Sequence, residues 1–329
     1  MANNDNRGFN TVHESNVSRR DQRVRLQRMT LLAIIGIAIL MVISVLVLVI
    51  GSIASGLDHP TEEDSAPVGG KVVWETATVS AKDTVTGDLV VVNASNKYTF
   101  PEDESYLSKV YNVAVKSASS YVDGGADYME TNALSAVDKM LVDMAAATGY
   151  KKATLAEAYR TLAQQEGKSL APGYSDHHTG RLCTINVKDE SAKAWLASNA
   201  HKYGFVVRYP NAKSDITGVS NYEYAYRYVG VAHATYMYNN NLCLEEYVDY
   251  LSANVTNKKP LSVTGADGNT YDIYYYTVGS GASISVPSNY EYTVSGTNKG
   301  GVVVTVCRTA SQQEVNTAAD SAAVTEAQS

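Results

Sequence analysis

Residues that could do chemistry gather between positions 155 and 230 of this 329-residue chain. Arg160 carries a planar guanidinium that can hold a carboxylate through two parallel hydrogen bonds. His177 lies among small and polar residues and could be a metal ligand. Both fall within four short segments, 158–165 (AYRTLAQQ), 172–180 (PGYSDHHTG), 203–210 (YGFVVRYP) and 226–230 (YRYVG). Any one of these segments would be weak evidence, but the four in this order form a specific pattern.

In order and spacing, the four segments resemble the VanY-type D-alanyl-D-alanine carboxypeptidases, zinc peptidases that trim bacterial cell-wall stem peptides. The resemblance runs from about residue 87 to about residue 251. It implies the VanY/hedgehog-type zinc-peptidase fold. It also implies a site in which zinc takes three protein ligands and a water, with a carboxylate beside that water as general base.

The positions that would hold the metal and the base are largely changed. In the family pattern S-x-H-x-x-G-x-A-x-D, the histidine is present as His177, whereas Thr184 stands at the aspartate. In the pattern E-P-W-H-[FY]-R-Y-V-G, Ala225 stands at the third ligand and Tyr222 at the base. Alanine cannot bind a metal, and a neutral threonine hydroxyl is a poor substitute for a carboxylate. We therefore expect no cofactor and no catalytic residue, with His177 as the remnant of a metal site.

Nearby residues are poorly placed to rebuild the site. His178 should point away from His177, and Cys183 should face away from Thr184 if that segment is a strand. Glu223 should likewise face away from the base position, and His233 lies beyond the fourth segment. One alternative keeps an active zinc site with unorthodox ligands, and another makes both histidines ordinary polar loop residues.

The substrate side of the family pattern is better kept. The resemblance implies that Arg160 and Ser175 contact the terminal carboxylate of a peptide, with Gln165 matching the family glutamine and Thr161 replacing a serine. The alternative for Arg160 is a structural ion pair inside the domain. The emptied metal cavity could be filled by tyrosine side chains, for which the candidates are Tyr222, Tyr224 and Tyr226.

Three functions remain open at this point. The favoured one is a membrane-anchored, catalytically inactive domain that binds peptidoglycan stem peptide or a cell-wall protein. The first alternative is an active zinc D,D-carboxypeptidase, or an L,D relative. The second is a scaffold for a small β module that adheres to wall polymer.

The expected elements agree with an α+β domain over residues 87–257. Apolar residues at helical spacing predict a helix from Asn132 to a stop at Gly149, and a second helix that stops at Gly204. Helices and strands mix without regular βαβ alternation, which favours the α+β class. The remaining expected elements are strands at 88–93, 205–207 and 226–229 and a helix at 242–251.

After Pro260 the composition changes to short strands broken by turns, which predicts a small all-β module over 258–308. A hairpin turn is expected at 266–269, and a last strand at 301–307. The polar residues 309–329 read as a disordered tail.

The three cysteines, Cys183, Cys243 and Cys307, are too few for a disulfide scaffold or a four-thiolate zinc site. We expect all three to be buried and unpaired, because the β module should pack apart from the core.

The N-terminal part predicts a single membrane span. Residues 29–57 contain no charged side chain, and about 20 apolar residues suffice to cross a bilayer as a helix. The stub 1–28 has six arginines and three acids, whereas the linker and entry segment 58–86 opens with acids only. Positive-inside logic therefore places the stub in the cytoplasm and the rest outside the cell membrane. A cleaved signal peptide is the alternative. The net charge of −7 argues against nucleic-acid binding.

This topology predicts the outcome of protease treatment. Protease added to intact, wall-stripped cells should digest residues 71–308 and spare the stub, because only the region after the span faces outward. Immunoblotting with antibodies to each part checks this, and a protected 71–308 region would contradict it.

Overall fold

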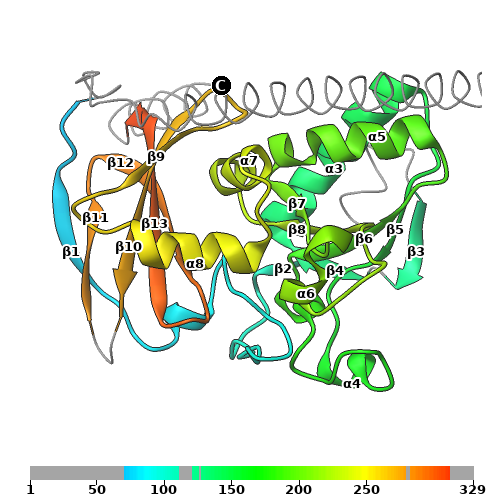
Figure 1. Ribbon diagram of the computed structural model, residues 1–329, viewed down its shortest axis with the longest axis horizontal. Helices are drawn as coiled ribbons and strands as arrows, with labels where there is room; N and C mark the ends of the chain where they lie inside the picture. The colour runs from blue at the N-terminus through cyan, green and yellow to red at the C-terminus, as the bar shows by residue number, and fades with distance from the viewer. Residues whose placement is uncertain (1–69, 111–120, 126, 279–281, 312–329) are drawn as a thin grey trace, which may run out of the picture. The chain divides into compact units, whose positions relative to one another are not determined.

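The computed structural model describes residues 70–110, 121–125, 127–278 and 282–311 (Figure 1). The predicted stub, the span at 29–57 and most of the predicted tail lie outside these residues. Within the described part of the chain, no helix has the length and apolar character needed to cross a membrane.

A five-stranded mixed sheet, in the order β3-β5-β6-β8-β7, is the frame of the domain. Its first pair is parallel and its other pairs are antiparallel. A separate short pair, β2 with β4, lies outside this sheet. The strands are β2 (Leu107–Lys109), β3 (Tyr121–Gly125), β4 (Tyr128–Glu130), β5 (Thr154–Glu157), β6 (Leu182–Asn186), β7 (Phe205–Val207) and β8 (Ala225–Tyr228).

Two helices cover one face of this sheet (Figure 1), α3 (Thr131–Thr148) and α5 (Glu190–Asn199). Both were predicted and are confirmed. The apolar face of α3 is buried against Cys183 and Ile185 of β6. Gly149 ends α3 in the left-handed conformation, with φ 74°, which glycine adopts without a Cβ penalty. The short helix η3 (Ala200–Tyr203) extends α5 as far as Gly204.

The other face of the sheet carries short elements, and two of them lie in segments of the sequence pattern. The short elements are α4 (Leu162–Gln165), η2 (Asp176–Thr179), η4 (Asn211–Lys213) and α6 (Ser214–Thr217). Alternation along β6 sends Thr184 to this face while Cys183 joins the core beneath α3.

Two helices follow the sheet, α7 (Val231–Asn239) and α8 (Leu244–Asn254). The second was predicted, whereas α7 was not. The β module then forms a four-stranded sheet in the order β12-β13-β10-β9. Its strands are β9 (Leu261–Thr264), β10 (Thr270–Thr277), β12 (Tyr290–Gly296) and β13 (Gly301–Ser311).

The expected entry segment 58–86 contains a strand, β1 (Trp74–Thr78), and a single turn of helix, η1 (Asp83–Val85). The strand pairs antiparallel with β11 (Ser283–Pro287). Strand β1 was not predicted from the sequence, because its partner lies some two hundred residues further along the chain and no local pattern reveals it.

The β module does not pack apart from the preceding domain. Tyr247 and Leu251 of α8 share a buried cluster with Ile273 of β10 and Val303 of β13. His233 of α7 adds a polar link to β13, because its Nε2 lies 2.9 Å from the Thr305 hydroxyl. The reason given for unpaired cysteines was thus wrong. All three cysteines are nevertheless free, with Cys183 and Cys243 buried and Cys307 only partly so.

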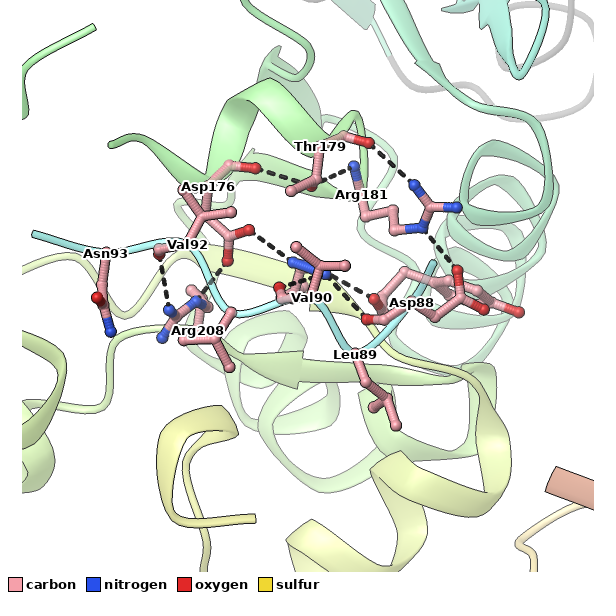
Figure 2. A network of polar contacts seen from close by, with 12 residues as sticks. Asp88, Leu89, Val90, Val92, Asn93, Asp176, Thr179, Arg181 and Arg208 are labelled. Atoms are coloured by element: carbon pink, nitrogen blue, oxygen red, sulfur yellow. Dashed lines mark hydrogen bonds and ion pairs between the residues drawn. The ribbon is translucent and has the colours of Figure 1, made fainter. Parts of the chain in front are cut away.

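The predicted strand at 88–93 pairs with no neighbouring strand. Its carbonyl oxygens are instead bound by guanidinium groups. Arg227 Nη2 donates to the carbonyls of Asp88 (2.9 Å) and Val90 (3.2 Å). Arg208 Nη2 donates to the carbonyl of Val92 (3.2 Å), and Figure 2 shows this pair. Its other edge meets the β module, where the Val91 amide donates to the Thr297 carbonyl. Arginine side chains thus take the place of a partner strand along segment 88–93, where the domain meets the β module.

Both arginines converge on Asp176, the first residue of η2. Arg208 Nε donates to one carboxylate oxygen, and Arg227 Nη1 donates to the other at 2.6 Å. Arg208 also binds Glu245 of α8 through two hydrogen bonds of 2.7 and 2.9 Å. Burial alone would lower the pKa of Arg208, but Glu245 and Asp176 outweigh it and raise that pKa well above its ordinary value. Two cations and two anions therefore balance inside the domain.

Removal of the central anion should be severely destabilising. Asp176→Ala leaves two guanidinium groups buried with one partner fewer, which costs about 3–5 kcal/mol of unfolding free energy. Urea denaturation of this variant measures the loss. Glu102→Ala, which breaks the exposed pair with Lys82, is the control and should match the parent protein. Equal stability of the two variants would contradict a structural role for Asp176.

Candidate functional site

The structure brings the three changed family positions together with the retained His177. Thr184 of β6 lies directly opposite Ala225 of β8 in the sheet register. His177 faces them from η2, and its Nε2 lies 3.1 Å from the hydroxyl of Tyr222. The same hydroxyl lies 3.0 Å from Thr184 Oγ1. The positions chosen from the sequence pattern are therefore spatial neighbours.

Tyr222 is the hub of this cluster. Besides His177 and Thr184, its hydroxyl contacts Glu157 Oε2 at 3.1 Å. Its ring packs against the cluster that contains Ala225 and stacks on Tyr209, with centroids 5.6 Å apart. The phenol thus fills the space beside the alanine and links three polar groups through one oxygen.

The other two candidate tyrosines do not fill this space. Tyr224 is 46% exposed and meets the Tyr222 ring edge-on. Tyr226 belongs to the core beneath α3 and α5, on the opposite face of the sheet.

The protonation states follow from the contacts. His177 Nδ1 lies 2.6 Å from the Ala158 carbonyl, so this nitrogen carries the proton and Nε2 is an acceptor. Burial, with help from the Arg160 charge, lowers the pKa of His177 to about 4. Burial also raises the pKa of Tyr222 to about 12. At neutral pH a neutral imidazole and a protonated phenol therefore face each other.

Glu157, at the end of β5, is a site residue that the sequence reasoning missed. Its Oε2 pairs with Arg160 Nη2, and its Oε1 lies 3.5 Å from Lys168 Nζ. Burial acts to raise the pKa of Glu157, but Arg160 and His177 outweigh it and the pKa lies below its ordinary value. The one sequence signal was an acid three residues before Arg160. The register that sets Glu157 opposite Thr184 was not readable from the sequence.

The residues matched to substrate binding have different surroundings. Arg160 Nη1 donates to Gln165 Oε1 at 3.0 Å, and Gln165 Nε2 donates to the Leu170 carbonyl at 2.8 Å. Both ends of the Gln165 amide are thus bonded within the protein, behind the guanidinium. Ser175 is buried at the start of η2, and its side chain makes no capping hydrogen bond there. The structural ion pair considered for Arg160 is present, with Glu157 as partner.

His177 and His178 are not ordinary polar loop residues, because both are buried in η2. The His178 ring points away from the site, as predicted. Its Nε2 accepts from the Gly173 amide at 3.0 Å, and its Nδ1 donates to the Arg160 carbonyl at 2.6 Å. The turn ends at Gly180, with φ 69°, where a Cβ would approach Leu107 to 2.6 Å. The turn therefore fixes both rings.

The remaining candidate ligands lie elsewhere. The Nδ1 of His233 lies 2.7 Å from the Tyr247 hydroxyl, in the seam with the β module. The Glu223 carboxylate accepts from the Asn211 amide at 3.0 Å and is exposed. Among the described residues, no group of three or more histidine, cysteine, aspartate or glutamate side chains could hold a metal ion.

Known proteins are similar to this chain. A family model described as VanY, D-alanyl-D-alanine carboxypeptidase, matches residues 126–231. A D-alanyl-D-alanine carboxypeptidase of Enterococcus faecium is 33% identical over 245 residues, which cover 70% of this chain and 78% of that protein. The chain belongs to the VanY-type D-alanyl-D-alanine carboxypeptidase family. The resemblance inferred from four short segments is thereby confirmed.

Further relatives agree with this assignment. A D-alanyl-D-alanine carboxypeptidase of Enterococcus faecalis is 41% identical over 92 residues, covering 26% of this chain and 34% of that protein. The crystal structure of the vancomycin-resistance D,D-dipeptidase VanXYg, in complex with a D-Ala-D-Ala phosphinate analogue, superposes with a TM-score of 0.60. It covers 72% of this chain and 100% of its own at 22% identity, so it supports the fold alone.

The residues present in this VanY-type chain do not fit the zinc ion that the family pattern implies. A catalytic zinc needs three donors and an open position for water. Of the three family positions, only His177 offers a strong donor, and its Nε2 faces the Tyr222 hydroxyl. Thr184 is bonded to the same hydroxyl, and Ala225 has no donor atom. The protein has hydrogen bonds where the pattern calls for coordination.

Deletion of the hub hydroxyl tests its structural role. Tyr222→Phe keeps the ring but leaves His177 Nε2 and the Thr184 hydroxyl without this partner. We expect a loss of about 1–3 kcal/mol in unfolding free energy, measured by chemical denaturation. Tyr224→Phe, at the exposed neighbouring tyrosine, is the matched control and should be close to neutral. Equal losses of unfolding free energy in the two variants would contradict a structural role for the Tyr222 hydroxyl.

Proposed function

We propose that this chain is a catalytically inactive member of its family that binds peptidoglycan stem peptide at the cell surface. The observation that carries this proposal is the Tyr222 hydroxyl, which bonds His177 and Thr184 at 3.1 and 3.0 Å. The ligand class comes from the relatives, which are named for action on D-Ala-D-Ala ends. The chain would thus bind the peptide without hydrolysing it.

The loss of hydrolysis follows from what the changed groups would have done. Zinc lowers the pKa of its bound water from about 15.7 to about 7, which supplies hydroxide at neutral pH. A positioned general base typically contributes a further 10²–10⁴-fold or so. Tyr222 at the base position keeps its proton at neutral pH, because burial raises its pKa to about 12. Neither hydroxide nor base is therefore supplied.

Recognition depends on the side of the site that is kept. We assign Arg160 to the terminal carboxylate of the peptide, because its fork suits two parallel hydrogen bonds. Ser175 supplies a second polar contact from the start of η2. Gln165 acts on Arg160 itself, since its Oε1 accepts from Nη1 at 3.0 Å, and it orients the guanidinium rather than touching the peptide.

The cellular setting is part of the proposal. Residues 29–57 would anchor the chain in the cell membrane with the site outside, where stem peptides are exposed. A cell-wall protein that presents a carboxylate is the second partner class. In either case the β module, which shares a core with α8, moves with the binding domain as one unit.

Calorimetry of the purified full-length chain with an acetylated L-Lys-D-Ala-D-Ala peptide tests the proposal. We expect binding without release of D-alanine. Arg160→Ala should weaken binding by about 10- to 150-fold, because it removes a charge-assisted contact worth roughly 1.5–3 kcal/mol. Lys193→Ala, which removes a surface charge paired with Glu190, is the control and should leave binding unchanged. An absence of heat at millimolar peptide would exclude the peptide-binding function and favour the scaffold.

A further inference from the structure

We propose that Glu157 is an internal competitor for the carboxylate clamp. It holds the guanidinium edge of Arg160 that a peptide's terminal carboxylate would take, and it thereby sets the affinity of the site and its selectivity for a free carboxyl end. This inference rests on the proposed function, since it concerns the same site.

The contacts of Arg160 carry the first step. Its side chain is 12% exposed, and its Nη2 pairs with Glu157 Oε2. Its Nη1 donates to Gln165 at 3.0 Å. A carboxylate bound to a guanidinium prefers a two-pronged arrangement, and here both terminal nitrogens already have partners. A peptide carboxylate that takes the same edge with two prongs must compete with one of these partners, and the amide of Gln165 is the more deeply buried.

Glu157 has a second position available, which makes it the partner that moves. Its side chain is 29% exposed, and its Oε1 faces Lys168, which is 47% exposed and 3.5 Å away. A shift toward Lys168 keeps the carboxylate paired and in contact with solvent. Arg208 offers a contrast within the same domain. Its carboxylate partners are 0% and 7% exposed, so they cannot shift toward solvent as Glu157 can. The Arg160 pair is therefore exchangeable, whereas the Arg208 pairs are fixed.

The hub hydroxyl tolerates this exchange. Tyr222 donates its single proton to Glu157 at 3.1 Å, and His177 Nε2, also an acceptor, lies at the same distance from the phenol oxygen. When Glu157 leaves, the phenol proton can turn to the imidazole nitrogen. No buried acceptor is left unpaired. The main interaction lost when Glu157 is displaced is therefore its ion pair with Arg160.

The competition predicts a specific ligand preference. A free terminal carboxylate matches the charge that Glu157 supplies and can replace it. A terminal carboxamide carries no charge, so it leaves Glu157 in place and gains nothing when that carboxylate is removed. Glu157→Gln should therefore improve binding of the free-acid peptide selectively.

The experiment compares acetylated L-Lys-D-Ala-D-Ala with its C-terminal amide, by calorimetry on the full-length chain. We expect Glu157→Gln to bind the free acid roughly 10-fold or more tightly than the parent does and to leave the amide unchanged. Glu157→Ala should show the same direction, which guards against a fold defect in either variant. Glu223→Gln makes the same charge change at an exposed carboxylate and should have no effect. Adding Arg160→Ala to Glu157→Gln should abolish the gain.

The outcomes separate this inference from the proposed function. If the parent binds the free acid and neither Glu157 variant binds it more tightly, the competitor is excluded while the binding function stands. If neither the parent nor the variants bind, both proposals are overturned. An equal gain for acid and amide, or for Glu223→Gln, would show that general electrostatics is responsible and would also exclude the competitor.

Discussion

The site depends on one buried carboxylate, Asp176, held between Arg208 and Arg227. These three side chains have no exposed surface. Loss of one partner would therefore leave an uncompensated buried charge. Arg227 lies in β8 and Arg208 follows β7, whereas Asp176 opens the turn η2. The network therefore fixes the turn that carries His177 against the sheet that carries Thr184 and Ala225. The same guanidinium groups hold segment 88–93, which places the β module on the domain.

Within this fixed frame, the family positions come together although three of them carry other side chains. The ligand positions of the family lie together, and one tyrosine hydroxyl lies within hydrogen-bond distance of His177 and Thr184. Replacement of a few side chains accounts for the proposed loss of hydrolysis. The retained Arg160, paired with Glu157, links the site to carboxylate recognition and also to competition for it. A single cluster thus contains the residue proposed to bind the peptide and the residue proposed to compete with it.

Much of this arrangement was predictable from the sequence, and the failures have physical causes. Helix α3 and the hairpin turn between β9 and β10 have clear local signals, a periodic apolar face and a turn sequence, and both were predicted. The site positions were found because the resemblance to the family patterns places Thr184 and Ala225 at two of the ligand positions. Strand β1, the seam at 88–93 and the role of Glu157 depend on partners distant in the chain, and local patterns carry no information about them. Asp176 had one overlooked signal, since arginines within apolar strands require a buried anion.

The zinc content of the purified full-length chain, measured by elemental analysis after zinc loading and desalting, tests the central claim most directly. The triple variant Thr184→Asp, Tyr222→Glu, Ala225→His provides the comparison, because it restores the ligand and base positions of the family pattern. We expect no stoichiometric zinc in the parent chain, zinc uptake by the variant, and D-Ala-D-Ala turnover by the parent equal to the buffer blank. Stoichiometric zinc in the parent, with hydrolysis that a chelator abolishes, would contradict the account.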